Sequence, residues 1–278
     1  MEFTKMQGTG NDFVLINGFI EAIDQENYAK LAISLCDRHF GIGADGIMIA
    51  LPSESCDIKM RIINADGSEA EMCGNGLRCF AFYVKEEGLV NSNKFTVETL
   101  AGTMIPEIKE ISDGNAMIRV NMGEPFIKAA DIPVTSTNVA PLLNESMTIL
   151  NQKVDFVPIG MGNPHCVIFT DTITEETVQT LGPAIENNTS VFPNKTNVEF
   201  IQIITDTEIN MRVWERGAAE TLACGTGACA SVVAGILSGK LNKAVIVHLL
   251  GGDILVEWAE NEPVFMTGPA EIVFKGSL

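Results

Sequence analysis

The stretch "SEAEMCGNGLRCFAF" at residues 68–82 holds a cysteine followed by Gly-x-Gly, where a polar run of sequence turns apolar. The stretch "TLACGTGACASVVAG" at residues 221–235 has the same arrangement. Aligning the two stretches pairs Cys73 with Cys224, at an offset of 151 residues (224 − 73). One chain therefore builds the same Cys-Gly-x-Gly corner twice, which raises the question of an internal repeat.

The repeat extends well beyond the two corners. The matched segments are 59–76 with 210–227, "GTGN" ending at Asn11 with "GMGN" ending at Asn163, and "VETLAGTMI" (97–105) with "VHLLGGDIL" (247–255). They follow one another in the same order, and their offsets are almost equal. A chance match of small glycine motifs does not explain a common order and spacing, so the sequence predicts two copies of one domain.

Short β-rich runs such as "FVLI", "DIKMRII" and "VEFIQII", separated by turn residues, recur along the chain and predict many strands. Each cysteine corner is instead followed by a helical pattern, expected over 76–87 and 227–238 and ended by Gly88 and Gly239. The second helical stretch is apolar on nearly every side and therefore has to be surrounded. We expect an α+β fold of two pseudo-symmetric domains, each a curled, mostly antiparallel β-sheet or barrel wrapped around a central hydrophobic helix.

The boundary between the two domains is expected where Gly123 and Pro125 break regular structure. The strand pattern near the C-terminus is expected to return to the first domain. That gives a first domain of residues 1–119 plus 268–278, carrying Cys73, and a second of residues 120–267, carrying Cys224. A weaker helical pattern predicts one peripheral helix in each domain, over residues 31–40 and 174–186.

Composition excludes several classes of function. The 278 residues are 46% hydrophobic and carry a formal charge of −18, which argues against binding to nucleic acid or to an anionic membrane surface. No apolar run is long enough to cross a bilayer, and the first residues have no signal-peptide core, so we expect a cytoplasmic protein. The seven cysteines are odd in number and form no Cys-x-x-Cys pair, which predicts free thiols and no metal site.

Cys73 and Cys224 differ from the other cysteines because each is expected at the start of a helix. The unpaired N–H groups and partial positive charge of a first turn favour a thiolate, and can lower a cysteine pKa from about 8.5 to roughly 3.5–7.5. The glycines that follow let a carboxylate approach the same N–H groups. Two such corners on either side of a small molecule suit removal of a proton from one face of a carbon and its return to the other, which is racemisation or epimerisation.

The sequence also resembles the diaminopimelate epimerase family over essentially its whole length. The segments that carry this resemblance are "GTGNDF" (8–13), "FGIGADG" (40–46), "NADGSEAEMCGNGLRC" (64–79), "GMGNPHCV" (160–167) and "ERGAAETLACGTGA" (215–228). The resemblance implies interconversion of LL- and meso-diaminopimelate, in the synthesis of lysine and peptidoglycan precursors. It further implies that no pyridoxal phosphate or metal is used, that the small-molecule substrate is diaminopimelate, and that the chain forms a homodimer.

Roles for individual residues follow from the same resemblance. Cys73 and Cys224 match the catalytic acid and base, and His165 and Glu215 match an auxiliary catalytic pair. A buried Arg216 is expected to pair a distal carboxylate bidentately. The positions that match the family's substrate-binding set are Asn11, Asn64, Gly74, Asn75, Asn163, Asn197, Glu215, Arg216, Gly225 and Thr226.

The chain departs from the family pattern at two positions. Gly46 stands where some members carry glutamine, so a side-chain contact there is lost or is made by the backbone. Ala219 stands where glycine is frequent, which mildly tightens the turn. Arg78, one turn into the first central helix, is equally compatible with a structural ion pair and with a ligand contact.

Other functions remain compatible with the residues alone. A proline or hydroxyproline racemase or epimerase, or a histidine racemase, would use the same two thiols. A non-enzymatic alternative is a thiol redox switch in which Cys73 and Cys224 form a disulfide. Binding of an amino acid without turnover is a third alternative.

Overall fold

The computed structural model describes all 278 residues, which form two compact units. Unit 1 comprises Met1–Asn121 and Thr267–Leu278, and unit 2 comprises Met122–Met266. The elements of unit 1 are β1 (Glu2–Gly8), β2 (Asn11–Asn17), η1 (Gln25–Asn27), α1 (Tyr28–Cys36), β3 (Gly46–Leu51), β4 (Ile58–Asn64), β5 (Glu69–Ala70), α2 (Gly74–Glu86), β6 (Val97–Thr99), β7 (Gly102–Met104), β8 (Glu107–Ser112), β9 (Asn115–Asn121) and most of β18 (Phe265–Ser277).

Unit 2 repeats the order of these elements. Its elements are β10 (Glu145–Ile149), β11 (Gln152–Gly160), β12 (Pro164–Phe169), α3 (Glu175–Glu186), β13 (Asn197–Thr205), β14 (Glu208–Glu215), β15 (Ala219–Thr221), α4 (Gly225–Leu237), β16 (Ala244–Leu249) and β17 (Gly252–Glu257). Strands β11 to β17 match β1 to β7 in turn, and helices α3 and α4 match α1 and α2. No helix of the chain is long and apolar enough to span a membrane.

Strand pairing follows the same scheme in both units. In unit 1, β1–β2, β3–β4 and β6–β7 are antiparallel, whereas β2–β3 and β4–β6 are parallel. In unit 2, β11–β12, β13–β14 and β16–β17 are antiparallel, whereas β12–β13 and β14–β16 are parallel. The expected α+β fold with mostly antiparallel sheets and an internal repeat is thus confirmed.

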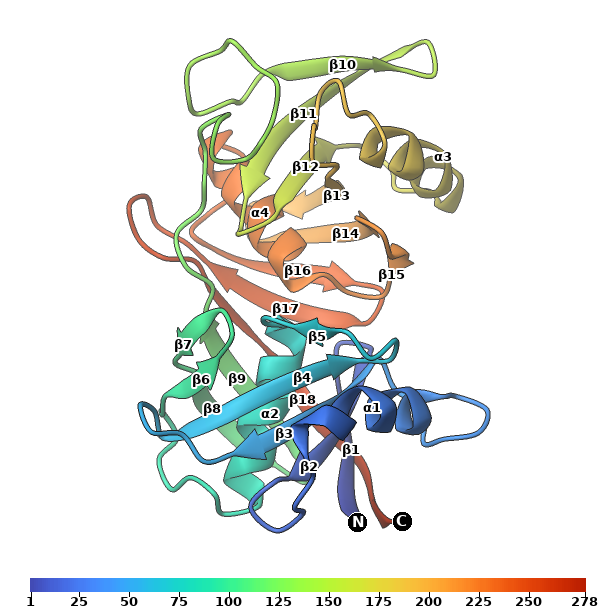
Figure 1. Cartoon of the computed structure of the whole chain (residues 1–278). Coiled ribbons are helices and arrows are strands. Elements are labelled where there is room, and N and C mark those ends of the chain that lie inside the picture. Colours follow the sequence, from blue (N-terminus) through green and yellow to red (C-terminus); the bar gives the residue numbers. More distant parts are fainter. The chain divides into compact units, whose positions relative to one another are not determined.

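Each unit has one helix at its centre (Figure 1). Helix α4 contacts β11, β12, β13 and β17, and its residues from Gly227 to Gly235 are buried on every side. Helix α2 contacts β1, β2, β3, β8 and β9 and is buried from Asn75 to Val84. Surrounding strands are what the largely apolar α4 requires, because none of its faces tolerates water.

The sheet strands bury one face against the central helix. Along β14, Ile209, Met211 and Val213 alternate with less buried residues and lie in the core around α4. The opposite face of the same sheet is covered by α3, where Trp214 packs against a second core that contains Phe200. Successive side chains of a strand point to opposite faces of the sheet, so alternate residues of β14 reach each of the two cores.

The central helices end where the sequence predicts, but they begin slightly earlier. Gly88 and Gly239 have φ angles of 68° and 69°, the left-handed conformation in which a helix stops most easily. Both helices begin two residues earlier than expected, at Gly74 and Gly225, because the preceding cysteine is itself the capping residue.

The first peripheral helix was expected over 31–40, but α1 ends at Cys36. The carboxylate of Asp37 accepts hydrogen bonds from the backbone N–H groups of His39 (2.7 Å) and Phe40 (2.8 Å). An aspartate that binds the backbone two and three residues ahead of it forms a turn that competes with the helix. The second peripheral helix, α3, lies within the expected residues.

The left-handed backbone of Ala219 makes one departure from the family pattern measurable. Its φ is 61°, a conformation that costs an L-residue with a β-carbon about 1–2 kcal/mol. Ala219→Gly removes this strain, but part of the gain is offset because glycine loses more chain entropy on folding. The free energy of unfolding is therefore expected to rise by a net ~0.5–1 kcal/mol. Chemical denaturation of the two proteins measures the difference.

The neighbouring residue supplies the control for this prediction. Ala218→Gly gives the same chemical change at an exposed position outside the left-handed region, so it should lower stability slightly. Equal effects of the two substitutions would contradict the interpretation of strain at Ala219.

Candidate active site

Cys73 and Cys224 are the N-cap residues of the two central helices. Both have extended backbone conformations, and their sulfur atoms accept hydrogen bonds from the first turn. Cys73 Sγ lies 3.4 Å from Gly76 N, and Cys224 Sγ lies 3.3 Å from Gly227 N. Each sulfur therefore takes the place that a serine or aspartate oxygen commonly takes at a helix start.

In unit 1, the start of α2 is tied to the β1–β2 turn by amide groups. Asn75 Nδ2 donates a hydrogen bond to Asn11 Oδ1, and Arg78 Nη1 donates to Asn75 Oδ1 at 2.8 Å. Arg78 is fully buried, and it also donates to Thr9 Oγ1 (2.9 Å) and to the Pro269 carbonyl (3.0 Å). These contacts make Arg78 a structural residue of unit 1.

A cluster of charged side chains surrounds Asp12 at the start of β2. Asp12 binds Arg38 at 2.8 Å and Lys5 at 2.7 Å, and Arg38 also binds Asp45 at 2.9 Å. Burial raises the pKa of Asp12, but hydrogen bonds from Arg38 and Lys5 outweigh it, so the pKa falls to about 2. Asn11 Nδ2 donates to Asp45 Oδ2 at 3.2 Å, so this cluster also fixes a predicted site residue.

Asn64 and Gly46 lie opposite each other at the ends of β3 and β4. Asn64 Nδ2 donates to Ser68 Oγ at 3.0 Å, within the turn that leads to β5. A β-carbon on Gly46 would lie 2.7 Å from the Ile63 carbonyl oxygen. A glutamine side chain at position 46 would therefore require the backbone to shift.

In unit 2, His165 is completely buried between two polar side chains. Its Nδ1 lies 2.6 Å from Glu199 Oε1, and its Nε2 lies 2.8 Å from Asn163 Oδ1. Glu199 is also fully buried. The sequence prediction missed Glu199, which lies within the apolar run "NVEFIQII". A charged residue inside a buried strand was the available signal.

Cys224 lies among carboxylates. Burial raises the pKa of Cys224 well above its usual range, and the negative charges of Glu215 and Glu199 raise it further against hydrogen bonds from Thr226 and Gly227. Its Sγ lies 3.4 Å from Thr226 Oγ1. In this structure, burial and neighbouring negative charge therefore act against the thiolate that a helix start favours.

Glu215 ends β14 on the same side of unit 2. Its carboxylate accepts a short hydrogen bond from Thr221 Oγ1. Burial raises the pKa of Glu215, and the charge of Glu199 adds to it, while hydrogen bonds from Thr221 and Cys224 act in the opposite direction. A carboxyl group with a raised pKa beside a thiol can exchange protons with it.

Two residues expected to hold the substrate, Asn197 and Arg216, differ in burial. Asn197 is buried, accepts a hydrogen bond from Arg216 N (2.9 Å) and donates to the Pro164 carbonyl (2.9 Å). Arg216 was expected to be buried, but it is exposed, since it follows the last residue of β14 in a surface turn. Its Nη1 donates to the Asn194 carbonyl at 3.1 Å, and it lines one pocket with Asn163 and Pro164.

Each unit thus gathers one cysteine and polar neighbours at the start of its central helix. The predicted residues gathered in unit 1 are Asn11, Cys73, Gly74 and Asn75, while Asn64 lies at the end of β4. The predicted residues of unit 2 are Asn163, His165, Asn197, Glu215, Arg216, Cys224, Gly225 and Thr226.

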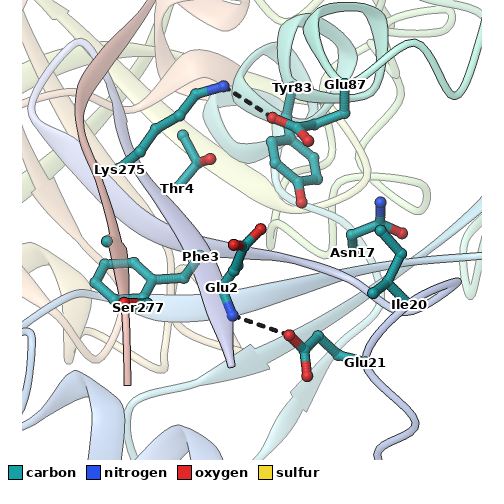
Figure 2. A pocket seen from close by; sticks show the side chains of 11 residues that line it. Glu2, Phe3, Thr4, Asn17, Ile20, Glu21, Tyr83, Glu87, Lys275 and Ser277 are labelled. Atoms are coloured by element: carbon teal, nitrogen blue, oxygen red, sulfur yellow. Dashed lines mark hydrogen bonds and ion pairs between the residues drawn. The ribbon is translucent and has the colours of Figure 1, made fainter.

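Unit 1 also has a pocket of its own, shown in Figure 2, which contains none of the predicted site residues. It lies between the outer ends of β1 and β18 and the last turn of α2. Three of its side chains are carboxylates, Glu2, Glu21 and Glu87, and Lys275 Nζ pairs with Glu87 at 2.9 Å. It has no thiol and no imidazole, and therefore lacks the combination of groups found in unit 2 around Cys224.

Comparison with known proteins places this geometry in a family. The family model for diaminopimelate epimerase matches residues 3–128 and 157–273. A diaminopimelate epimerase of Pelotomaculum thermopropionicum is 51% identical over 99% of this chain and 98% of that protein.

Solved structures with much lower identity share the fold. A PhzF-family phenazine biosynthesis protein of Bacillus anthracis has a TM-score of 0.71 at 17% identity, over 100% of this chain and 98% of its own. A probable proline racemase from Agrobacterium radiobacter has a TM-score of 0.69 at 16% identity, over 100% and 92%. Identity of about half over the full length, together with the repeated N-cap cysteines, shows that the chain belongs to the diaminopimelate epimerase family.

Proposed function

We propose that the protein interconverts LL- and meso-diaminopimelate by a two-base reaction at one α-carbon, with Cys73 and Cys224 as the two catalytic groups. The observation that carries the proposal is the repeated N-cap cysteine, one at the start of each central helix. The 51% identity to a diaminopimelate epimerase supports the choice of substrate.

The proposed reaction moves two protons and no electrons. One sulfur, as a thiolate, removes the α-proton and becomes a thiol. The other sulfur, as a thiol, gives its proton to the opposite face of the same carbon and becomes a thiolate. The configuration is inverted, and all bonds to carbon other than the C–H bond are kept. Neither pyridoxal phosphate nor a metal ion is needed for this balance.

The intermediate concentrates negative charge on the substrate carboxylate. The backbone N–H groups at the first turn of a helix are fixed dipoles, and they stabilise such charge most strongly where water is excluded. Gly74, Asn75, Gly225 and Thr226 begin the two helices, so their backbone would supply these donors. The raised pKa of Cys224 supports assigning it the thiol role in the state described here.

The other predicted residues complete the proposed site. We assign His165 and Glu215 to proton exchange beside the reacting carbon, and Arg216 to the distal carboxylate. The amide groups that we assign to substrate binding are Asn11, Asn64, Asn163 and Asn197. Because Arg216 is exposed in a turn, pairing it with a carboxylate requires no break in a buried contact.

Deuterium exchange tests the proposal directly. The protein would be incubated under reducing conditions in deuterated water with LL-diaminopimelate, L-proline or L-histidine, and α-deuterium would be measured by mass spectrometry. We expect deuterium in diaminopimelate together with formation of the meso isomer. Exchange into proline or histidine alone would establish the corresponding racemase instead, and the absence of any exchange would favour a redox or binding function.

We also propose a cytoplasmic homodimer. The cytoplasm is where the proposed precursor pathway operates and where free thiols persist. Sedimentation equilibrium measures the oligomeric state, and a mass equal to one 30.0 kDa chain would contradict the dimer.

A further inference from the structure

The internal repeat allows each residue beside Cys224 to be compared with its counterpart beside Cys73. In unit 2, β12 and β13 pair His165 with Asn197 and Val167 with Glu199. In unit 1, the matching strands β2 and β3 pair Phe13 with Gly46 and Leu15 with Met48. By register, the counterparts of His165 and Glu199 are therefore Phe13 and Met48.

These counterparts also occupy the same place against the central helices. A β-carbon built on Gly76 in α2 would clash with Met48 Cε and lie 3.4 Å from Phe13 Cζ. A β-carbon on Gly227, the matching position in α4, would lie 2.7 Å from Glu199 Oε1. Both helices thus use a glycine in the first turn to admit a side chain from the third strand of the repeat.

Packing alone does not account for a carboxylate at position 199. Met48 and Phe13 show that the site can be filled by two apolar side chains, both of which are buried. In unit 2, both partners of the buried His165–Glu199 pair have no exposed surface, and Glu199 Oε2 has no hydrogen-bond partner. An unsatisfied buried polar atom costs about 1–3 kcal/mol, so the apolar pair would be the more stable solution.

The contacts of the pair define what the carboxylate does. Carboxylate oxygens are the usual acceptors for an imidazole N–H, so we assign the proton of the 2.6 Å contact to His165 Nδ1. Nε2 contacts the side-chain amide of Asn163 at 2.8 Å, in the turn that precedes β12. An amide presents either an acceptor oxygen or a donor nitrogen, so this contact serves Nε2 both with and without a proton. With Nδ1 held, the ring cannot rotate or change tautomer, and Nε2 is the nitrogen left to exchange a proton.

Resting on the role of His165 in the proposed function, we propose that Glu199 is a positioning residue of the reaction, which fixes the ring of His165 and its Nδ1 proton. Carboxylates that orient metal-bound histidines typically contribute 10–100-fold to metal affinity or activity, and we expect an effect of the same order here. The charge of Glu199 also acts on Cys224, whose pKa it helps to raise, so one side chain influences two groups of unit 2.

Two substitutions at position 199 separate charge from position. Glu199→Gln keeps an oxygen for Nδ1 but removes the charge, and we expect kcat for diaminopimelate epimerisation to fall about 10-fold. Glu199→Met copies the residue found in unit 1 and removes both, with an expected fall of about 100-fold. KM should stay within about twofold in both, because Glu199 is completely buried and is not among the residues assigned to substrate binding.

A matched control comes from another buried carboxylate of unit 2. Glu145 is the first residue of β10, is 9% exposed and lies outside the predicted site. Its carboxylate accepts hydrogen bonds from Ser136 Oγ (3.0 Å) and Asn138 Nδ2 (2.7 Å). Glu145→Gln is expected to leave kcat unchanged. Thermal unfolding of all variants checks that each one folds.

Nuclear magnetic resonance tests the proposal without substrate. The chain has three histidines, so ¹⁵N-histidine labelling gives a spectrum that His39→Gln and His248→Gln variants assign. In the wild type, we expect His165 to show an Nδ1 proton that is shifted far downfield and exchanges slowly. Glu199→Gln should weaken that signal, and Glu199→Met should abolish it.

The two readouts distinguish failure of this inference from failure of the proposed function. Wild-type kcat in folded Glu199→Met, or an unchanged His165 spectrum in that variant, would overturn the positioning role while leaving the epimerase proposal intact. A change in KM alone would overturn it as well. Inactivity of the wild type on diaminopimelate would overturn the proposed function, and the histidine spectra would still decide whether Glu199 holds the ring.

Discussion

Replacing either N-cap cysteine by serine, as Cys73→Ser or Cys224→Ser, is expected to lower kcat for diaminopimelate epimerisation by about 10²–10⁴-fold. A serine hydroxyl is a far weaker acid than a thiol, and its alkoxide does not form at neutral pH, so the α-proton is neither removed nor replaced efficiently. Conversion of LL- to meso-diaminopimelate by each purified variant measures the loss.

Serine is the informative substitution because it preserves the helix cap. The sulfur atoms accept hydrogen bonds from Gly76 N and Gly227 N, and serine is among the preferred residues at that position. Melting temperatures should therefore stay close to that of the wild type. A loss of activity in folded variants then reports on the chemistry.

Cys56→Ser is the matched control. Cys56 is a partly exposed thiol of unit 1, in contact with Thr103 Oγ1 at 3.5 Å and outside the predicted site. Its replacement should leave kcat unchanged. Full activity in either Cys73→Ser or Cys224→Ser would end the two-base proposal, and equal losses in all three variants would point to a general effect of thiol removal.

Arg78→Met is expected to lower the free energy of unfolding by about 3 kcal/mol. The buried guanidinium donates hydrogen bonds to Asn75, Thr9 and the Pro269 carbonyl, and methionine fills the space without replacing those donors. Thr9 has a φ of 52°, which is unfavourable for a β-branched residue and has to be held by its surroundings. Chemical denaturation, followed by circular dichroism, measures the change.

Lys85→Met provides the comparison on the same helix. Lys85 lies in the last turn of α2 and reaches the Asn91 carbonyl at the surface, so its loss should change stability by no more than about 0.5 kcal/mol. A similarly small effect of Arg78→Met would contradict a structural role and would restore ligand binding as the role of Arg78.

The fold was predictable because the signals that carry it are local and repeated. The almost entirely apolar composition of residues 227–235 indicated a surrounded helix, and Gly88 and Gly239 marked helix ends that the left-handed φ angles confirm. The repeat then extended the same architecture to both parts of the chain. The end of α1 was misplaced because a hydrogen-bonded turn at Asp37 competes with a helical pattern that continues beyond it.

The environment of the candidate site was less accessible to sequence reasoning. The cysteine at position 224 indicated an acid–base group at a helix start. Its pKa, however, depends on burial and on carboxylates brought from other strands, which the sequence does not show. The exposure of Arg216 follows from its position in a turn, which the motif alone did not reveal. Glu199 could have been found by comparing the repeats at equal offset, where a charged residue replaces Met48. The assignment of substrate contacts stays a prediction.

The last strand has a consequence for how the protein is made. Strand β18 pairs antiparallel with β1, from Glu2 opposite Ser277, and the N-terminal ammonium group of Met1 binds the Leu278 carbonyl at 2.7 Å. Unit 2 is a continuous segment, whereas unit 1 needs both ends of the chain. During translation, unit 2 is fully synthesised before unit 1 receives β18, so the edge of β1 that pairs with β18 stays unpaired until that strand has been made.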